Sequence, residues 1–360
     1  MRQRSRMKPS RIAIAGLLTV LAGCATVPKP ITEIVWPAPP LTPRIRFVGL
    51  LRNRDDLQQL SADRAAGGGV IEFLMGEKTL PSSLRQPMDV AVSRGGRRLY
   101  VTDYAKPGVV VFDIESGTVQ PLGSDELFKT PFGIALDDQD NVYVTDSDPR
   151  RIYVFDPQGT QRATITHETL ERPTDLAIDM ARRRLYVADP PSQTIKVFDL
   201  DGTYRSVLDG KSDTENQLAS PTYLAVDASG ALYVTDTLNG QVKVFDAEGR
   251  FVKTIGEHGD AYGMFDKPKG VALDSLGNVY VADSAWSNVQ IFNPEGQALL
   301  FFGGRGRVPG LLFNPTGLTI DADNRIYVAD AFNARVALYE LINTAAAENV
   351  MSEPSTGGER

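Results

Sequence analysis

One pattern recurs six times along this chain, and it constrains the fold more than any other feature. Each copy follows a proline, passes through a short apolar stretch and a polar turn, and then runs through a second apolar stretch into an aspartate. The six copies cover 88–103, 132–146, 174–189, 222–236, 269–283 and 316–330, and the closing aspartates are Asp103, Asp146, Asp189, Asp236, Asp283 and Asp330. These aspartates are 43 or 47 residues apart, a period that indicates a repeat architecture.

Each repeat predicts one four-stranded sheet. The apolar stretches are rich in β-branched and aromatic residues and are bounded by Asp, Gly and Asn turns, which favours strands. The second stretch is continuously apolar, so we expect it to be buried on both sheet faces. Further stretches follow in most copies, such as 242–249 and 250–256. Sheets of this period that bury both faces can pack radially around an axis, and six of them predict an all-β, six-bladed β-propeller.

The ends of the repeat region predict how the ring closes. The sixth repeat supplies three strands, the last at 336–341, and an unpaired edge is an aggregation hazard. The segment 44–51 has the pattern of a fourth strand, so we expect it to complete the sixth blade, giving a propeller over 44–341. A short helix and loop are expected within 57–75. The tail at 342–360 has no apolar face and is expected to be disordered.

The repeat resembles the NHL repeat. The resemblance rests on a proline followed by a hydrophobic-Ala-hydrophobic-Asp stretch, a Tyr-Val-Thr/Ala-Asp strand and a Val-x-Val-Phe-Asp strand, and it extends over about 255 residues. Six tandem copies make it specific. WD40 repeats do not fit, because no Trp-Asp pair ends a repeat. The resemblance implies a six-bladed NHL-type propeller.

The N-terminus predicts export. Residues 1–11 are basic and residues 12–23 are apolar, and twelve residues span about 18 Å as a helix, too short to cross a bilayer. This arrangement is typical of a secretory signal peptide. The tetrapeptide that ends at Cys24 resembles the lipobox of bacterial lipoproteins, which implies removal of 1–23 and attachment of lipid to Cys24. The alternative is an ordinary signal peptide with an unrelated cysteine.

The residues after Cys24 predict a tether and a location. Ala25 follows the cysteine, and by analogy with lipoprotein sorting a residue other than Asp favours the periplasmic face of the outer membrane. The stretch 24–43 is dense in proline, which favours extended conformations, so we expect a semi-rigid spacer. Partners expected on this basis are the membrane itself and an envelope protein, peptide or glycan.

Charge argues against nucleic acid as a partner. The whole chain carries a net charge of −7, and without residues 1–23 the net charge becomes −12. Such a body repels phosphate backbones. Cys24 is also the single cysteine, so the chain forms no intramolecular disulfide and no cysteine-based metal cluster.

Residues for catalysis are few. The closing aspartates occur once per repeat, which favours a turn-forming or loop-capping role over metal binding. Some NHL-type propellers use histidines around the central channel, but His167 and His258 lie in non-neighbouring repeats and do not supply three zinc ligands. The residues just after the blade prolines, among them Asp89, Asp175, Tyr223 and Lys269, are expected to line the channel mouth, and two carboxylates with a lysine make a poor calcium site. We therefore expect no metal and no cofactor.

Aromatic residues break the repeat pattern and predict a binding site. Tyr104, Trp286 and Phe332 lie in loops after the closing aspartates, on the same face as the loops that begin each repeat. With Tyr223 and Lys269 they form a candidate recognition patch, because aromatic side chains are enriched at interface hot spots. Alternatively, these rings pack on their own blades.

The favoured function is a membrane-anchored, non-catalytic binding or scaffold propeller for a protein, peptide or polysaccharide. The alternative is a divalent-metal-dependent lyase or hydrolase of the lactonase-like propeller class.

Overall fold

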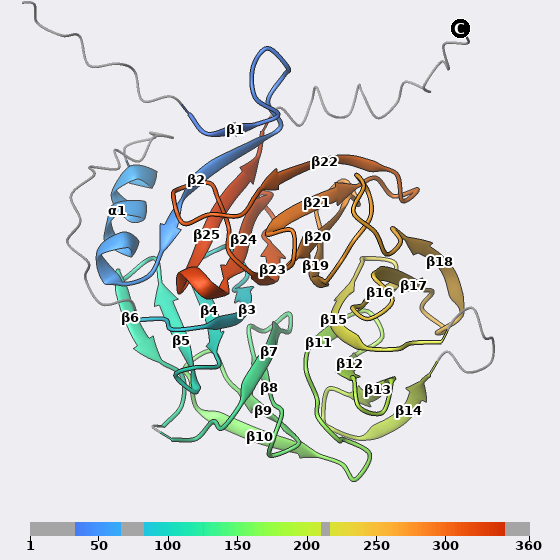
Figure 1. Ribbon diagram of the computed structural model, residues 1–360. Helices are drawn as coiled ribbons and strands as arrows, with labels where there is room; N and C mark the ends of the chain where they lie inside the picture. The colour runs from blue at the N-terminus through green and yellow to red at the C-terminus, as the bar shows by residue number, and fades with distance from the viewer. Residues whose placement is uncertain (1–32, 66–82, 125, 210–216, 343–360) are drawn as a thin grey trace, which may run out of the picture. The chain divides into compact units, whose positions relative to one another are not determined.

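The computed structural model describes residues 33–65, 83–124, 126–209 and 217–342, which form six antiparallel sheets around a central channel (Figure 1). The sheets follow one another around the ring in chain order and are numbered here as blades 1 to 6. The predicted signal peptide, Cys24, the first part of the spacer and the predicted disordered tail after residue 342 lie outside the described residues.

In each of blades 1 to 5 the strands pair in chain order from the channel outward. Blade 1 contains β3 (Pro87–Val92), β4 (Arg98–Asp103), β5 (Gly108–Asp113) and β6 (Thr118–Pro121); blade 2 contains β7 (Pro131–Leu136), β8 (Val142–Asp146), β9 (Arg151–Phe155) and β10 (Gln161–Thr166); blade 3 contains β11 (Leu176–Asp179), β12 (Arg184–Asp189), β13 (Thr194–Asp199) and β14 (Tyr204–Leu208). Blade 4 contains β15 (Pro221–Val226), β16 (Leu232–Asp236), β17 (Gln241–Phe245) and β18 (Phe251–Ile255); blade 5 contains β19 (Pro268–Leu273), β20 (Val279–Asp283), β21 (Asn288–Phe292) and β22 (Ala298–Gly303).

Blade 6 joins both ends of the described chain. Its strands are β23 (Pro315–Ile320), β24 (Arg325–Asp330), β25 (Arg335–Leu341), β2 (Ile45–Leu51) and β1 (Val35–Trp36), with a short 3₁₀ turn at Ala331–Asn333. Strand β2 pairs antiparallel with β25, so the predicted N-terminal closing strand is confirmed. Helix α1 (Arg54–Ala65) follows β2 and begins slightly before the predicted segment.

The sheet begins earlier than the sequence predicts. Val35 and Trp36 lie within the stretch expected to be a spacer, yet they form β1 and pair with Arg46 and Ile45 of β2. The Trp36 ring also packs against Tyr339, with 5.7 Å between ring centroids. The rigid part of the molecule therefore includes the end of the proline-rich stretch, because one aromatic side chain anchors it to the core.

The core lies between neighbouring blades. The second strands β8, β16 and β20 are buried at every position, as their continuous apolar sequence predicts. Their side chains alternate between the two faces of each sheet and meet those of the next blade. Phe198 and Tyr143, for example, belong to one cluster that joins blades 2 and 3. Each buried large apolar side chain contributes about 1.5–3 kcal/mol, so the ring is held together blade by blade.

Candidate functional site

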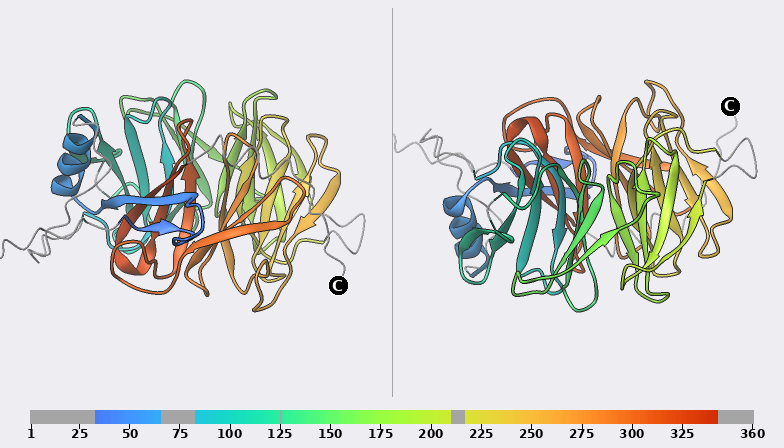
Figure 2. Two further views of the ribbon diagram at one scale, coloured as in Figure 1. Left: turned by 90° about the horizontal axis from the view of Figure 1, so that it is seen from above. Right: turned by 90° about the horizontal axis from the view of Figure 1, so that it is seen from below.

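Two kinds of loop share one face of the ring. The loop after the second strand of each blade, called the tip loop here, lies at the same end as the loop that links one blade to the next. The strand register requires this arrangement, because Pro87 lies opposite Asp103 in blade 1 and Pro131 lies opposite Asp146 in blade 2. We call this side the loop face, and Figure 2 shows strands running between it and the opposite face.

The closing aspartates hold the linking loops in place. All six are completely buried, and their carboxylates accept hydrogen bonds from loop amides. Asp236, for example, accepts from the amides of Ala219 and Ser220. Burial within this amide network explains why the residue occurs once per blade, and it confirms the predicted structural role. Among the described residues, no group of three or more His, Cys, Asp and Glu side chains is arranged to hold a metal ion.

The linking loop before blade 6, residues 304–314, is fixed by a buried ion pair. Arg335 Nε donates to the Asp330 carboxylate at 2.7 Å, and both side chains are almost completely buried. The same guanidinium donates to the backbone carbonyls of Arg307 and Leu311, at 2.8 and 2.7 Å. Asn333 donates to the carbonyl of Gly306 at 2.9 Å. This long loop is therefore preorganised rather than free to rearrange.

Three predicted aromatic residues are exposed on consecutive blades. Tyr104 of blade 1 and Trp286 of blade 5 are each 42% exposed, and Phe332 of blade 6 is 55% exposed. The first strands of these blades are in contact around the ring, β19 with β23 and β23 with β3. Phe332 packs edge-on against Phe313 at 5.3 Å, so this ring rests on its own blade while still presenting half of its surface to solvent.

Tyr223 and Lys269 do not belong to this exposed patch. Tyr223 is 1% exposed and lies in the central channel, where its hydroxyl donates to the carbonyl of Met88 at 3.1 Å. The expectation that Tyr223 is available on the loop face is therefore wrong, because this strand position points to the ring axis. Lys269 is half-buried, and burial together with the charge of Lys267 lowers its pKa.

Sequence reasoning missed three exposed apolar residues on this face. Leu238, at the tip loop of blade 4, is 75% exposed; Tyr262 and Val308, in the linking loops before blades 5 and 6, are 55% and 61% exposed. They extend the patch to a fourth blade. The sequence signal was a large apolar residue at the tip of a polar loop, and a search limited to aromatic tip-loop residues passed over it.

Charge divides the loop face into two sectors. The aromatic sector comprises segments 83–86, 104–107, 284–287, 303–314 and 331–334 of blades 5, 6 and 1. Its exposed charged residues are Arg85, Lys106, Arg305 and Arg307, and these segments contain no Asp or Glu. The linking loop before blade 5, at 256–267, borders the sector and adds exposed Glu257, Asp260 and Lys267. The polar sector comprises the loops of blades 2 and 3, at 126–130, 147–150, 167–172 and 190–193. It mixes Lys129, Arg150 and Arg172 with Glu126, Asp148, Glu168 and Glu171.

Two carboxyl groups line the central channel. Asp89 and Asp175 are 5% and 4% exposed and lie within hydrogen-bonding reach of each other. They line, with Tyr223, one end of a channel cavity of about 280 Å³. Burial raises the pKa of both carboxyl groups, and the neighbouring charge of Asp175 raises that of Asp89 further.

The two histidines lie away from the channel cavity. The His167 ring stacks on Tyr204 of the outer strand β14, with 4.2 Å between ring centroids, and its Nδ1 is 2.8 Å from the Thr169 hydroxyl. His258 is exposed in the linking loop before blade 5. Neither lines the cavity that contains Asp89 and Asp175.

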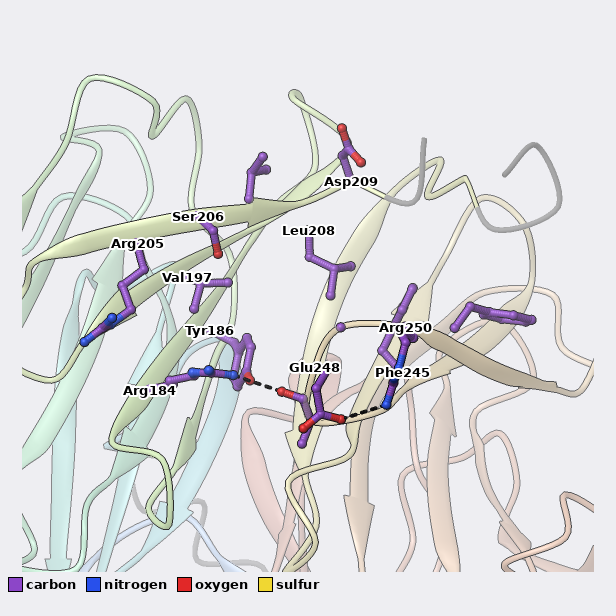
Figure 3. Close-up of a pocket in the computed structure, with 14 residues that line it drawn as sticks. Arg184, Tyr186, Val197, Arg205, Ser206, Leu208, Asp209, Phe245, Glu248 and Arg250 are labelled. Atoms are coloured by element: carbon purple, nitrogen blue, oxygen red, sulfur yellow. Dashed lines mark hydrogen bonds and ion pairs between the residues drawn. The ribbon is translucent and has the colours of Figure 1, made fainter. Parts of the chain in front are cut away.

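A larger groove of about 650 Å³ lies between blades 3 and 4 (Figure 3). Arg184 donates to the carbonyl of Ala247 at 2.9 Å, and Arg250 is paired with Glu248 at 3.1 Å. Arg98 of blade 1 donates in the same way to the carbonyl of Pro157 in blade 2, so this contact is a recurrent tie between blades. The groove is formed partly by a turn on the face opposite the loop face, and its cations are already engaged.

Comparisons with known proteins agree with this architecture. Residues 265–292 match the NHL repeat. An auxiliary nutrient binding protein from Bacteroides ovatus has a similar structure, with a TM-score of 0.58, 14% identity, and coverage of 71% of this chain and 69% of that one. A streptogramin B lyase gives a TM-score of 0.55 at 13% identity, covering 73% of this chain and 95% of the lyase. No curated protein matches the chain.

A third similar structure is that of the nidogen/laminin complex, with a TM-score of 0.53 and 24% identity over 62% of this chain and 81% of that chain. The six sheets define the class as a six-bladed β-propeller, and the matched segment supports blades of the NHL-repeat type. At these identities the similar structures establish the fold, and proteins of different function share it.

Proposed function

We propose that this protein is a lipid-anchored envelope lipoprotein that acts as a non-catalytic binding propeller and uses the aromatic sector to hold an acidic surface of another envelope protein. The observation that carries the proposal is the coincidence of exposed rings and exposed cations on neighbouring loops of blades 5, 6 and 1. Trp286, Phe332 and Tyr104 supply the rings, and Arg305 and Arg307 are among the cations.

The composition of this sector suits a protein partner. Trp, Tyr and Arg are enriched among residues that dominate binding energy, and complementary charge selects the partner and speeds its approach. The chain as a whole is acidic, so a cationic sector is a local departure that directs an acidic partner to one side of the ring. The Arg335–Asp330 pair supports the proposal further, because a preorganised loop loses less conformational entropy on binding.

The membrane anchor is the second part of the proposal. Two or three acyl chains on Cys24 would hold the protein durably at a membrane, since each buried CH₂ contributes about 0.8 kcal/mol. Within the described residues, no helix combines the length and apolar character needed to span a bilayer. Replacing Cys24 with Ser is expected to move the protein from the membrane fraction to the soluble fraction, and mass spectrometry of the wild type should show acylation at this residue.

The binding part is tested with an envelope extract and purified protein. The variant Tyr104→Ala/Trp286→Ala/Phe332→Ala is compared with wild type and with a control, Asp148→Ala/Ser192→Ala, in the polar sector. A hot-spot cluster contributes about 2 kcal/mol or more, so we expect at least a ~30-fold loss of affinity for the retained protein in the aromatic variant alone.

The outcomes separate the proposed function from its alternatives. Equal retention by all three proteins would remove the aromatic sector from consideration. Retention of acidic glycan or anionic lipid instead of protein would contradict the proposed partner. Stoichiometric zinc or calcium in the purified wild type, measured by elemental analysis, would favour the metal-dependent enzyme over a binding propeller.

A further inference from the structure

The second residue after each blade proline points to the ring axis, and this position differs between blades. The six residues are Asp89, Gly133, Asp175, Tyr223, Gly270 and Gly317. The acids stand in blades 1 and 3, and a glycine stands beside each of them. These six positions around the axis therefore combine three large side chains with three glycines. The glycines leave room for the larger side chains to occupy the channel.

The glycines make room for the acids. A Cβ added at Gly317 would lie 2.0 Å from Asp89 Oδ1, and one added at Gly133 would lie 2.5 Å from Asp175 Oδ1. Real side chains do not approach so closely, so any other residue at either position would displace a carboxyl group. Each carboxyl group thus lies against the glycine of the preceding blade, where no side chain competes for its place.

One carboxylate oxygen of each acid accepts a hydrogen bond from a backbone amide of the next blade. Asp89 Oδ2 accepts from the amide of Ile134 in blade 2 at 2.9 Å, and Asp175 Oδ2 accepts from the amide of Leu224 in blade 4 at 2.8 Å. Asp175 Oδ1 is buried and has no hydrogen-bond partner. A buried, unsatisfied carboxylate oxygen beside a second carboxyl group is costly unless something positive lies between them.

The groups that surround the pair do not supply that positive charge. Tyr223 faces the acids from blade 4, and burial, with the two nearby carboxyl groups, raises its pKa, so it stays neutral. Blade 5 contributes Lys269, whose pKa is lowered mainly by burial and which forms no ion pair with either acid within the described structure. Blade 2 contributes Phe132 and Gly133, and blade 6 contributes Thr316 and Gly317, none of which titrates.

We propose that Asp89 and Asp175 hold a shared proton at neutral pH and that this proton fastens the loop-face end of the central channel. When the proton is on Asp89, the carboxyl O–H donates the hydrogen bond that Asp175 Oδ1 otherwise lacks. The proton also removes the repulsion between two buried carboxylates. Because the two acids bond to blades 2 and 4, the closure joins four consecutive blades around the axis. Loss of the proton at high pH leaves two adjacent negative charges and weakens this tie.

The direction in which stability changes with pH follows from the fact that the folded protein holds the proton more tightly than the unfolded chain does. An aspartate in the unfolded chain releases its proton near pH ~3.9, whereas burial raises the pKa of Asp175 to about 7 and that of Asp89 above its usual range. The folded protein therefore keeps protons that the unfolded chain has lost. Stability from this pair is fully present below about pH 4 and is lost as the pH rises through the pKa values of the folded state.

The test is urea unfolding of the full-length protein from pH 4 to pH 9, with wild type, Asp89→Asn and the control Asp227→Asn. Each retained proton reduces the folding equilibrium constant about tenfold per pH unit in the window where it is lost on unfolding. The side-chain amide introduced by Asp89→Asn cannot ionise and can donate to Asp175. We therefore expect this variant to lose most of the pH dependence and to exceed wild type in stability at high pH. The control removes a turn carboxylate outside the channel and should keep the wild-type slope.

Two further readouts decide the proposal. Infrared difference spectra of wild type and Asp89→Asn at neutral pH should show a protonated carboxyl band that is present in wild type alone. Absence of this band, or an unchanged pH slope in Asp89→Asn, would overturn the proposal. A metal ion bound by wild type and released in Asp89→Asn would also overturn it, because a cation would then occupy the place of the proton.

Discussion

The aromatic sector and the polar sector of the loop face share the same arrangement of strands and loops but carry different side chains. In the aromatic sector the tip loops of blades 5, 6 and 1 carry exposed Trp286, Phe332 and Tyr104, and the segments that form this sector also carry Arg85, Lys106, Arg305 and Arg307. In the polar sector the tip loops of blades 2 and 3 contain no exposed large apolar side chain among their described residues, and acids balance the cations. In both sectors, the buried closing aspartates accept hydrogen bonds from backbone amides of the linking loops.

The two sectors differ in the residues at the loop tips and agree in the buried aspartates beneath them. The closing aspartate cannot change without exposing loop amides to an apolar interior, so it is constant in all six blades. The tip of the loop touches little, and its side chain can change without affecting the blade. An aromatic residue at the loop tip in three consecutive blades is therefore informative about function, whereas the aspartate beneath it is informative only about the fold.

The buried ion pair beneath the aromatic sector should make the greatest difference to the free energy of unfolding. Arg335 and Arg151 occupy equivalent positions opposite the closing aspartates of blades 6 and 2, but Arg335 is buried in an ion pair and Arg151 is half-buried. Replacing Arg335 with Ala leaves a buried charge without its partner and should cost about 3–5 kcal/mol in the free energy of unfolding. Replacing Arg151 with Ala should cost less than about 1 kcal/mol. Chemical denaturation of both variants measures the difference, and equal losses would show that the two sectors are built alike.

Charge reversal should give an intermediate effect on binding. The variant Arg305→Glu/Arg307→Glu inverts the aromatic sector, and we expect about a tenfold loss of partner affinity with a weaker dependence on salt. The matched change Arg150→Glu/Arg172→Glu in the polar sector should leave affinity within about twofold of wild type. Titrations at low and high salt check this expectation. Equal effects of the two variants would mean that net charge, rather than its location, controls binding.

Leu238 should give the smallest effect and mark the boundary of the binding surface. Its side chain is 75% exposed in the tip loop of blade 4, beside blade 5. Replacing it with Ala should change the free energy of unfolding by less than about 0.5 kcal/mol, because an exposed side chain contributes little packing. Partner affinity should fall by less than about fivefold if Leu238 lies at the rim. A loss as large as that of the aromatic variant would move the centre of the surface toward blade 4.

Much of the fold follows from local pattern. The repeats predict the blades, and the strand-like segment 44–51 predicts the closing strand because its pattern matches the strand that blade 6 lacks. The two-residue strand β1 was not predicted, since a short pairing held by one tryptophan has no periodicity and lies among prolines. Loop-capping aspartates were predicted because a residue that recurs in every blade has a structural role.

The site was predicted less completely, and the misses have physical reasons. Tyr104, Trp286 and Phe332 are exposed as expected, since the strand register fixes which loops share a face. Tyr223 was expected both in the exposed patch and at the channel mouth, and its side chain lies in the channel, because a position two residues after the blade proline does not by itself tell which of the two places a ring takes. The identities of the six residues two positions after the blade prolines contain that information, because glycines beside acids indicate side chains crossing the axis.

Site-specific photo-crosslinking in intact cells tests where the partner binds. A photoreactive residue is placed at position 286 in the aromatic sector and, in a separate protein, at position 192 in the polar sector. We predict that position 286 forms a crosslink to an acidic envelope protein, that position 192 does not, and that Arg305→Glu/Arg307→Glu weakens the crosslink. Crosslinks of equal strength from both positions, or from position 192 alone, would contradict the central claim that the aromatic sector is the binding surface.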